Sequence, residues 1–132
     1  MASGEWRVVS GEVRHYRELL VWQKAVSWVE AIYAVTRSWP QDERFGLISQ
    51  IRRAAVSVPS NIAEGCARRS TAEFVRFLSI SRGSLAEAET QIILATRLSY
   101  MDQGSQTSLL DAADEISRML AGLIAKLEER RT

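Results

Sequence analysis

The sequence predicts an all-α protein, an antiparallel up-down-up-down bundle of four helices. Three observations support this prediction. Apolar residues recur at spacings of three and four along four segments, short joints containing proline, glycine and serine separate those segments, and no alternating run typical of a strand competes with them. At 132 residues the chain is long enough for one domain with a substantial core. We therefore expect a single bundle domain over residues 17–132, preceded by a loosely ordered arm over residues 1–16.

The first helix is expected between Arg17 and Pro40, because the residue before a proline is disfavoured in helical backbone. Two seams run along this segment in steps of three and four, and they comprise Leu19, Trp22, Val26, Val29, Tyr33 and Thr36 on one side and Val21, Ala25, Trp28, Ile32, Val35 and Trp39 on the other. A helix with two seams contacts neighbours on two sides, inside the bundle and across a subunit boundary. We therefore expect an oligomer interface that contains Trp22, Trp28, Ile32 and Trp39.

The second helix is expected to begin at an N-cap at Asp42 and to end at Gly65. Its inward apolar positions are Ile48, Ile51, Ala55, Val58 and Ile62, and the last three keep their helical spacing across Pro59. Ser57 could instead cap a new segment with the proline in its first turn, but the preserved spacing favours one helix with a kink.

One face of this second helix carries a polar stripe formed by Gln50, Ser57, Asn61 and Glu64. We interpret the stripe as a hydrogen-bonded network that fixes the register between helices or subunits. Two alternatives stay open at this point, namely a surface that binds a ligand or nucleic acid and an exposed stripe without a role.

The third helix is expected to begin near Thr71, because Ser70 and Glu73 have the spacing of a capping box. Its seam consists of Phe74, Leu78, Ser81, Leu85, Ala88, Ile92, Ala95 and Ser99. Half of these residues are serine or alanine, which allows a neighbouring backbone to approach closely. Gly104 is expected to end this helix, and Ser105 to cap the fourth. The seam of the fourth helix consists of Leu109, Ala113, Ile116, Leu120, Leu123 and Leu127.

Charge is nearly balanced over the whole chain, with 17 basic and 16 acidic residues and a net charge of +1. The overall field therefore favours neither nucleic acid nor membrane as a partner. Five arginines could nevertheless form an electropositive rim where the second helix meets the third, namely Arg52, Arg53, Arg68, Arg69 and Arg76. Such a rim would bind the phosphates of RNA or DNA in a salt-dependent way. The alternative is ion pairing with carboxylates of this chain or of an oligomer partner.

The residues that catalysis or metal binding would need are scarce. His15 is the only histidine and Cys66 the only cysteine, so neither a set of two histidine ligands nor a nucleophile beside a base is expected. We expect no enzymatic activity, no cofactor and no metal. The sequence also has no apolar run of the length of a signal peptide or a membrane span, so we expect a cytoplasmic protein that does not bind membranes.

Three stretches carry a more specific resemblance, LLVWQKAVSWVEAIY, FGLISQIRRAAVSVPSNIAEG and RGSLAEAETQIILATRLSYM. They resemble the family of four-helix-bundle proteins encoded in intervening sequences of bacterial 23S ribosomal RNA genes, often labelled S23, over roughly residues 18–102. The resemblance implies a ring-like homopentamer of unknown biochemical activity. A distant similarity to the accessory variability protein of diversity-generating retroelements implies a pentameric barrel that binds nucleic acid and a reverse transcriptase. We therefore expect a non-enzymatic, self-assembling interaction protein, with nucleic-acid binding as the alternative function and another protein as a further partner.

Overall fold

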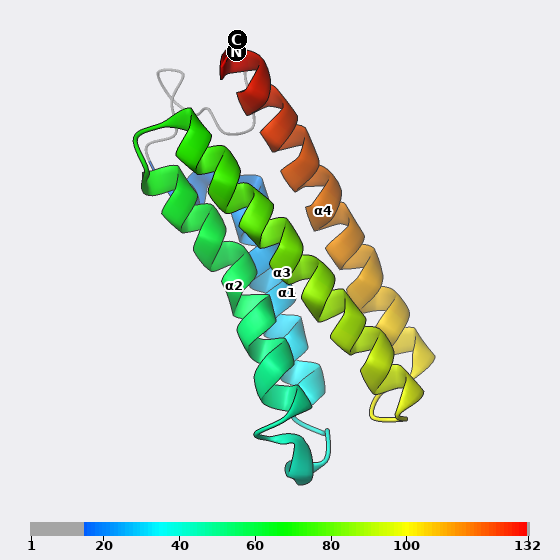
Figure 1. The fold of residues 1–132 in the computed structure, drawn as a ribbon. Coiled ribbons are helices and arrows are strands. Elements are labelled where there is room, and N and C mark those ends of the chain that lie inside the picture. The colour runs from blue at the N-terminus through cyan, green and yellow to red at the C-terminus, as the bar shows by residue number, and fades with distance from the viewer. Residues whose placement is uncertain (1–14, 132) are drawn as a thin grey trace.

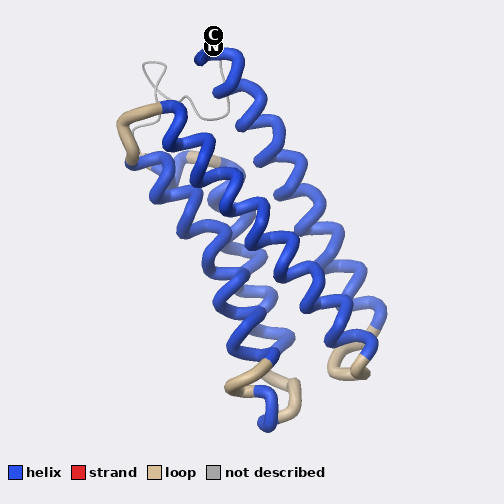
Figure 2. Tube along the Cα trace, in the orientation of Figure 1, coloured by secondary structure: helices blue, strands red, loops and turns tan. Residues whose placement is uncertain are grey.

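The computed structural model describes residues 15–131. In this part of the chain, four long α-helices and two short 3-10 helices make up the regular structure, and there is no strand (Figures 1 and 2). The elements are η1 (Tyr16–Glu18), α1 (Leu20–Thr36), η2 (Gln41–Glu43), α2 (Leu47–Ala67), α3 (Thr71–Arg97) and α4 (Gln103–Arg131). The prediction of an all-α protein with four helices is confirmed. Most of the expected N-terminal arm, residues 1–14, lies outside the described residues.

Each long helix contacts two others, so that α1 and α3 both lie between α2 and α4. Contacts between α2 and α3 join late residues of one helix to early residues of the other, as between Gly65 and Phe77. Between α1 and α4, Lys24 pairs with Glu115, whereas Trp28, which lies further along α1, bonds to Leu109, which lies earlier in α4. Both pairs of helices therefore run in opposite directions.

A single apolar core fills the space between the four helices. Its largest fully buried apolar side chains come from every long helix and from the residue before α1, and they are Leu19, Ile32, Ile51, Ile62, Leu78, Leu85, Ile92, Ile116, Leu120 and Leu127. These are positions of the seams read from the sequence, so the heptad-like spacing identified the core faces.

α2 continues without interruption through Pro59, which is buried. The expectation of one helix across the proline is therefore confirmed. Gly65 does not end the helix as expected, since α2 runs on to Ala67. A β-carbon at position 65 would lie 2.7 Å from the β-carbon of Phe77 and 3.3 Å from the backbone oxygen of Phe74. Glycine is therefore required here by the close approach of α3.

The predicted start of α3 is confirmed, because the Ser70 hydroxyl accepts a hydrogen bond from the Glu73 N–H at 3.0 Å. The other predicted ends are shifted. α2 begins at Leu47, where the Glu43 carboxylate accepts the Leu47 N–H at 2.9 Å, and Asp42 lies in η2 instead of capping α2. A carboxylate four residues before the helix satisfies an N–H that would otherwise lack a partner.

The joint between α3 and α4 also differs from the prediction. α3 ends at Arg97, and Ser99 adopts a left-handed backbone with φ of 66°. Asp102 then caps α4 by accepting the Ser105 N–H at 2.7 Å. Gly104 and Ser105 lie in the first turn of α4 and neither ends α3 nor caps α4.

Candidate functional site

The five arginines predicted to form one rim lie in two separate places. Arg52 and Arg53 belong to the first turns of α2, whereas Arg68 and Arg69 follow its end. A helix rises 1.5 Å per residue, so about 24 Å of helix axis separates Arg52 from Arg68. The expectation of a single cluster is therefore wrong, and only Arg68, Arg69 and Arg76 lie at the joint of α2 and α3.

These three residues are called the arginine joint below, and two of them lie against one aromatic ring. The guanidinium carbons of Arg68 and Arg76 lie 4.9 Å and 4.6 Å from the centre of the Phe77 ring. Arg68 also pairs with Glu64 at 2.8 Å, and Arg76 pairs with Glu73 at 3.5 Å.

The ion pairs at the arginine joint lie between side chains that are about half exposed, Arg68 at 46% and Glu64 at 52%. Exposed ion pairs of this kind contribute only about 0–1 kcal/mol. Arg69 is exposed as well. Phosphate oxygens could therefore replace the carboxylates at little cost.

Arg52 has a structural role that the sequence analysis missed. Its Nε donates to the Thr36 hydroxyl at 2.9 Å, and its guanidinium lies 4.4 Å from the centre of the Tyr33 ring. A second nitrogen donates to the Tyr33 carbonyl at 3.4 Å. Arg52 thus binds the carboxyl end of α1, where helix carbonyls lack partners within the helix. Arg53, the next residue of α2, is exposed.

The four residues of the polar stripe of α2 also fall into two groups. Ser57 and Ser84 exchange a hydrogen bond of 2.8 Å between α2 and α3, and the Asn61 amide donates to the Ser57 carbonyl and hydroxyl at 2.8 and 2.9 Å. Gln50 is exposed, and Glu64 pairs with Arg68. Two of the four stripe residues therefore form an inter-helix network.

A second serine hydrogen bond joins α2 to α3. Ser81 is fully buried and its hydroxyl donates to the Val58 carbonyl at 2.8 Å. In the sequence, Ser81 is a small residue of the α3 seam, and its hydrogen bond was not predicted. The acceptor is a backbone carbonyl of another helix, which no local pattern reveals.

Three of the four residues expected in an oligomer interface are buried within the single chain. Trp28 is 2% exposed and donates from its indole to the Leu109 carbonyl at 3.1 Å, Ile32 is 0% exposed, and Trp39 is 4% exposed beside the Tyr100 ring. Trp22 is half-buried, with its ring edge against Tyr16. The assignment of Trp28, Ile32 and Trp39 to a subunit boundary is corrected accordingly, because residues of the same chain cover them.

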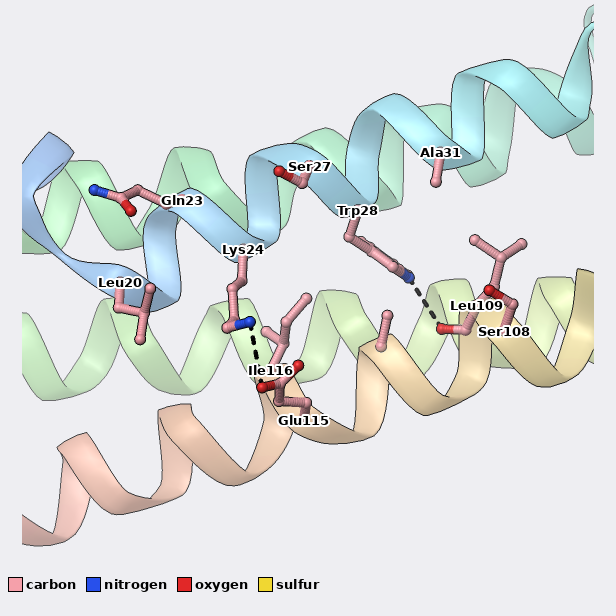
Figure 3. Close-up of a pocket in the computed structure, with 11 residues that line it drawn as sticks. Leu20, Gln23, Lys24, Ser27, Trp28, Ala31, Ser108, Leu109, Glu115 and Ile116 are labelled. Carbon is pink, nitrogen blue, oxygen red and sulfur yellow. Dashed lines mark hydrogen bonds and ion pairs between the residues drawn. The ribbon is translucent and has the colours of Figure 1, made fainter.

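An open cleft separates α1 from α4 on the surface of the bundle (Figure 3). It has a volume of about 430 Å³, and the small side chains of Ser27, Ala31, Ser108 and Ala112 line its sides. Trp28, Leu109 and Ile116 form an apolar floor, and Lys24 pairs with Glu115 across the cleft at 3.3 Å. We call this depression the α1–α4 cleft.

Large apolar side chains are exposed elsewhere on the surface. They are Leu20 at 52%, Tyr33 at 37%, Phe45 at 84%, Val56 at 39%, Ile80 and Ile93 at 40%, Leu94 at 45% and Leu98 at 47%. Leu20 lies at one end of the α1–α4 cleft, and three of the others gather near the end of α3. This surface was not predicted from the sequence, because the seams follow only the helix faces that point inward.

Few groups in the described residues are suited to catalysis or to metal binding. Burial raises the pKa of the Cys66 thiol, and the negative charge of Glu18 adds to this effect, so the thiol stays protonated near neutral pH. In residues 15–131 no group of three or more histidine, cysteine, aspartate or glutamate side chains is placed to hold a metal ion. None of the helices in this range combines the length and apolar character needed to cross a bilayer.

Comparison with known proteins agrees with this geometry. A protein of unknown function of the S23 ribosomal protein family from Bacteroides thetaiotaomicron VPI-5482, solved at 1.70 Å, superposes with a TM-score of 0.75 at 24% sequence identity. The match covers 80% of this chain and 96% of that protein, and it shows a shared fold. No curated protein matches this chain. The family model for the 23S rRNA-intervening sequence protein matches residues 17–122, so the chain belongs to the 23S rRNA-intervening sequence protein family.

Proposed function

We propose that this protein is a non-enzymatic, cytoplasmic bundle that works by assembling with copies of itself into a ring-like homopentamer. In this proposal each protomer is an antiparallel up-down-up-down bundle, which the opposite directions of α2 and α3 and of α1 and α4 support. The ring size of five comes from the family resemblance. The assembled ring would then present its outer surface to a further partner.

The observation that carries the proposal is the exposed apolar surface. Scattered single apolar residues are normal on a soluble monomer, whereas gathered ones mark an interaction surface. Here Ile93, Leu94 and Leu98 lie within six residues of one helix, each at least 40% exposed. The open α1–α4 cleft exposes further apolar surface on another side. Association with another copy would remove both from water.

A non-enzymatic role is supported by the Cys66 thiol, which stays protonated near neutral pH. The matching family model and the similar solved structure support it as well, since neither indicates an enzymatic family. The side chains that the sequence analysis singled out serve packing, capping and ion pairing. None of them is paired with a second group in an arrangement that would activate a nucleophile.

The test is multi-angle light scattering on the purified chain at micromolar concentration. A pentamer has a mass of about 74 kDa, five times the 14.8 kDa of one chain. A different closed oligomer would correct the ring size and keep the self-assembly. A mass of one chain across the concentration range would disprove the proposal.

The arginine joint supports a second candidate function, binding of RNA or DNA. The favouring observation is the placement of two guanidinium groups against the Phe77 ring, with Arg69 exposed beside them. Their ring contacts hold two positive charges on the surface, where phosphates can reach them. Such contacts give affinity that falls steeply with salt and depends little on sequence.

The double variant Arg68→Glu and Arg69→Glu tests this candidate in a gel-shift assay at low and moderate salt. We expect it to lose binding that the wild-type chain shows at low salt. Arg53→Glu is the matched control, because Arg53 is equally exposed but belongs to the other end of α2. Equal binding by the double variant and the wild-type chain would eliminate the arginine joint as a nucleic-acid site.

A further inference from the structure

A second hollow lies between the start of α1 and the last turns of α4, which Figure 1 shows at the same end of the bundle. It has a volume of about 280 Å³ and is lined by Leu19, Val21, Met119, Gly122, Leu123 and Lys126. The side chains of Leu19, Val21 and Leu123 are at most 5% exposed and form an apolar floor. We call this depression the Leu19 hollow.

Gly122 keeps the Leu19 hollow open. Met119, Gly122 and Lys126 follow one another at spacings of three and four, so they lie on one face of α4. A β-carbon at position 122 would have no atom within 4 Å. The residue between two long side chains therefore contributes no side chain of its own, and the space above the floor is left for apolar groups of another segment.

The described part of the chain begins beside this hollow. Leu19, which belongs to the floor, follows η1 directly, and its N–H donates to the Tyr16 carbonyl at 3.0 Å. The Gln23 amide of α1 donates to the Arg17 carbonyl at 2.8 Å. These two bonds hold η1 against the start of α1. Residues 1–14 therefore join the bundle at a fixed point, because His15 is separated from Leu19 by at most about 14 Å of chain.

The sequence of residues 1–14 contains a segment suited to an apolar hollow. Glu5, Trp6, Arg7 and Val8 alternate between polar and apolar side chains, and in an extended segment this alternation places Trp6 and Val8 on one side. Trp6 precedes His15 by nine residues, which can span up to about 30 Å. Glu5 also has the charge opposite to that of Lys126 at the edge of the hollow.

We propose that residues 5–8, called the strap below, cover the Leu19 hollow of their own chain, with the Trp6 ring against the apolar floor. A segment tethered this close has an effective concentration in the millimolar range, which favours it over a separate molecule. The strap joins the start of α1 to α4 and removes the apolar floor from water. It does not depend on the self-assembly proposed above, because the strap and the hollow belong to one chain.

Hydrogen–deuterium exchange of the full chain, followed by mass spectrometry, tests the strap. We expect the amides of residues 5–8 to exchange about tenfold faster in Gly122→Trp, which fills the hollow, than in the wild-type chain. Gly83→Trp is the matched control, because a β-carbon at Gly83 also has no atom within 4 Å but lies on α3. It should keep the slow exchange of the wild-type chain. Equal exchange in Gly122→Trp and the wild-type chain would overturn the inference.

A change in the strap itself keeps the test valid if Gly122→Trp does not fold, as circular dichroism would reveal. Trp6→Ala leaves the hollow intact and should show the same faster exchange of residues 5–8. Val9→Ala is its matched control, since Val9 falls on the other side of an extended segment and should keep the wild-type exchange. Unchanged exchange in Trp6→Ala would also overturn the inference.

A disulfide distinguishes a strap within one chain from a segment contributed by another copy. Glu5→Cys and Lys126→Cys are combined with Cys66→Ser, so that the new pair are the only two cysteines. A disulfide requires the two α-carbons to approach within about 7 Å. Oxidation should consume both thiols, and a denaturing gel without reductant should show the mass of one chain. Two free thiols, or a covalent dimer in which a second copy supplies the strap, would overturn the inference.

Discussion

The seam between α2 and α3 and the seam between α1 and α4 are built from similar sequence patterns but pack differently. Ser57, Ser81 and Gly65 bring α2 and α3 together through hydrogen bonds and a glycine contact. Between α1 and α4, the alanines and serines of the cleft face an open space, and Trp28 provides the buried hydrogen bond. Small residues therefore close a seam where their hydroxyl groups find an acceptor on the other helix, and leave a groove where they do not.

Removal of the Trp28 side chain should lower the stability of the protein more than any other change to the two seams, because Trp28 is the main buried contact of the looser α1–α4 seam. Trp28→Ala is expected to lower the free energy of unfolding by about 3–5 kcal/mol, since a large buried side chain is lost and a cavity remains. Urea unfolding followed by circular dichroism would measure the change.

Trp28→Phe is the matched control, because it keeps most of the apolar contact and loses only the bond to the Leu109 carbonyl. Its expected cost is about 1 kcal/mol, because one hydrogen bond is lost while the Leu109 carbonyl keeps its partner within α4. Equal stability of Trp28→Ala and the wild-type chain would show that the α1–α4 seam contributes little to folding.

The tight seam can be tested at its closest point. Gly65→Ala should lower the free energy of unfolding by about 1–3 kcal/mol, because the new β-carbon would lie 2.7 Å from the β-carbon of Phe77 and force α3 outward. Gly83→Ala is the matched control, since nothing lies within 4 Å of a β-carbon there. It should stabilise the protein by up to about 1 kcal/mol, because alanine favours a helix over glycine. The interpretation of Gly65 fails if both variants change the stability in the same direction.

The same seam has a smaller, purely polar contribution at Ser81. Ser81→Ala removes the hydroxyl that donates to the Val58 carbonyl at 2.8 Å, at an expected cost of about 1 kcal/mol. Ser79→Ala provides the control, because Ser79 is exposed on the same helix and should change the stability by less than about 0.5 kcal/mol. A Ser81→Ala variant as stable as its control would show that this hydrogen bond does not stabilise the seam between α2 and α3.

The features that were predicted correctly from the sequence depend on residues that are close together along the chain. The seams identified the core faces, and the capping box of Ser70 and Glu73 located the start of α3, because both signals lie within one segment. The doubled seam of α1 correctly indicated two neighbours. It could not show that both neighbours, α2 and α4, belong to the same chain, and so Trp28 and Trp39 were assigned to a subunit boundary.

The features that the sequence did not predict depend on distant residues. Arg52 lies beside other arginines in the sequence, but the carboxyl end of α1 holds its guanidinium, and the predicted rim therefore divides. The bond between Tyr100 and Glu43 spans 57 residues, and it joins the two loops that were predicted least well. The exposed apolar side chains of Ile93, Leu94 and Leu98 were missed for another reason, because periodicity shows which side of a helix is apolar and not what covers a minor apolar stripe.

The hydrogen bond between those two loops is expected to have the smallest effect on the stability of the protein, and this effect depends on pH. The Tyr100 hydroxyl donates to the Glu43 carboxylate at 2.8 Å. The pKa of Glu43 lies below its ordinary value of 4.5, first because of the Leu47 N–H and second because of Tyr100. The pKa of Tyr100 lies above its ordinary value of 10.0, chiefly because of the same bond. Stabilisation by Glu43 is therefore present above pH 4.5 and lost as the pH falls through its lowered pKa, whereas that by Tyr100 is present below pH 10 and lost as the pH rises.

Tyr100→Phe should accordingly destabilise the protein more at neutral pH than at an acidic pH below the lowered pKa of Glu43, where the carboxylate takes up a proton and the bond loses its charged acceptor. Urea unfolding of the variant and the wild-type chain at both pH values would give the two differences. Tyr33→Phe serves as the control, because the Tyr33 ring lies against Arg52 and its substitution should have the same effect at both pH values. An equal loss for Tyr100→Phe at the two pH values would mean that the ring of Tyr100 against Trp39, and not its hydroxyl, joins these loops.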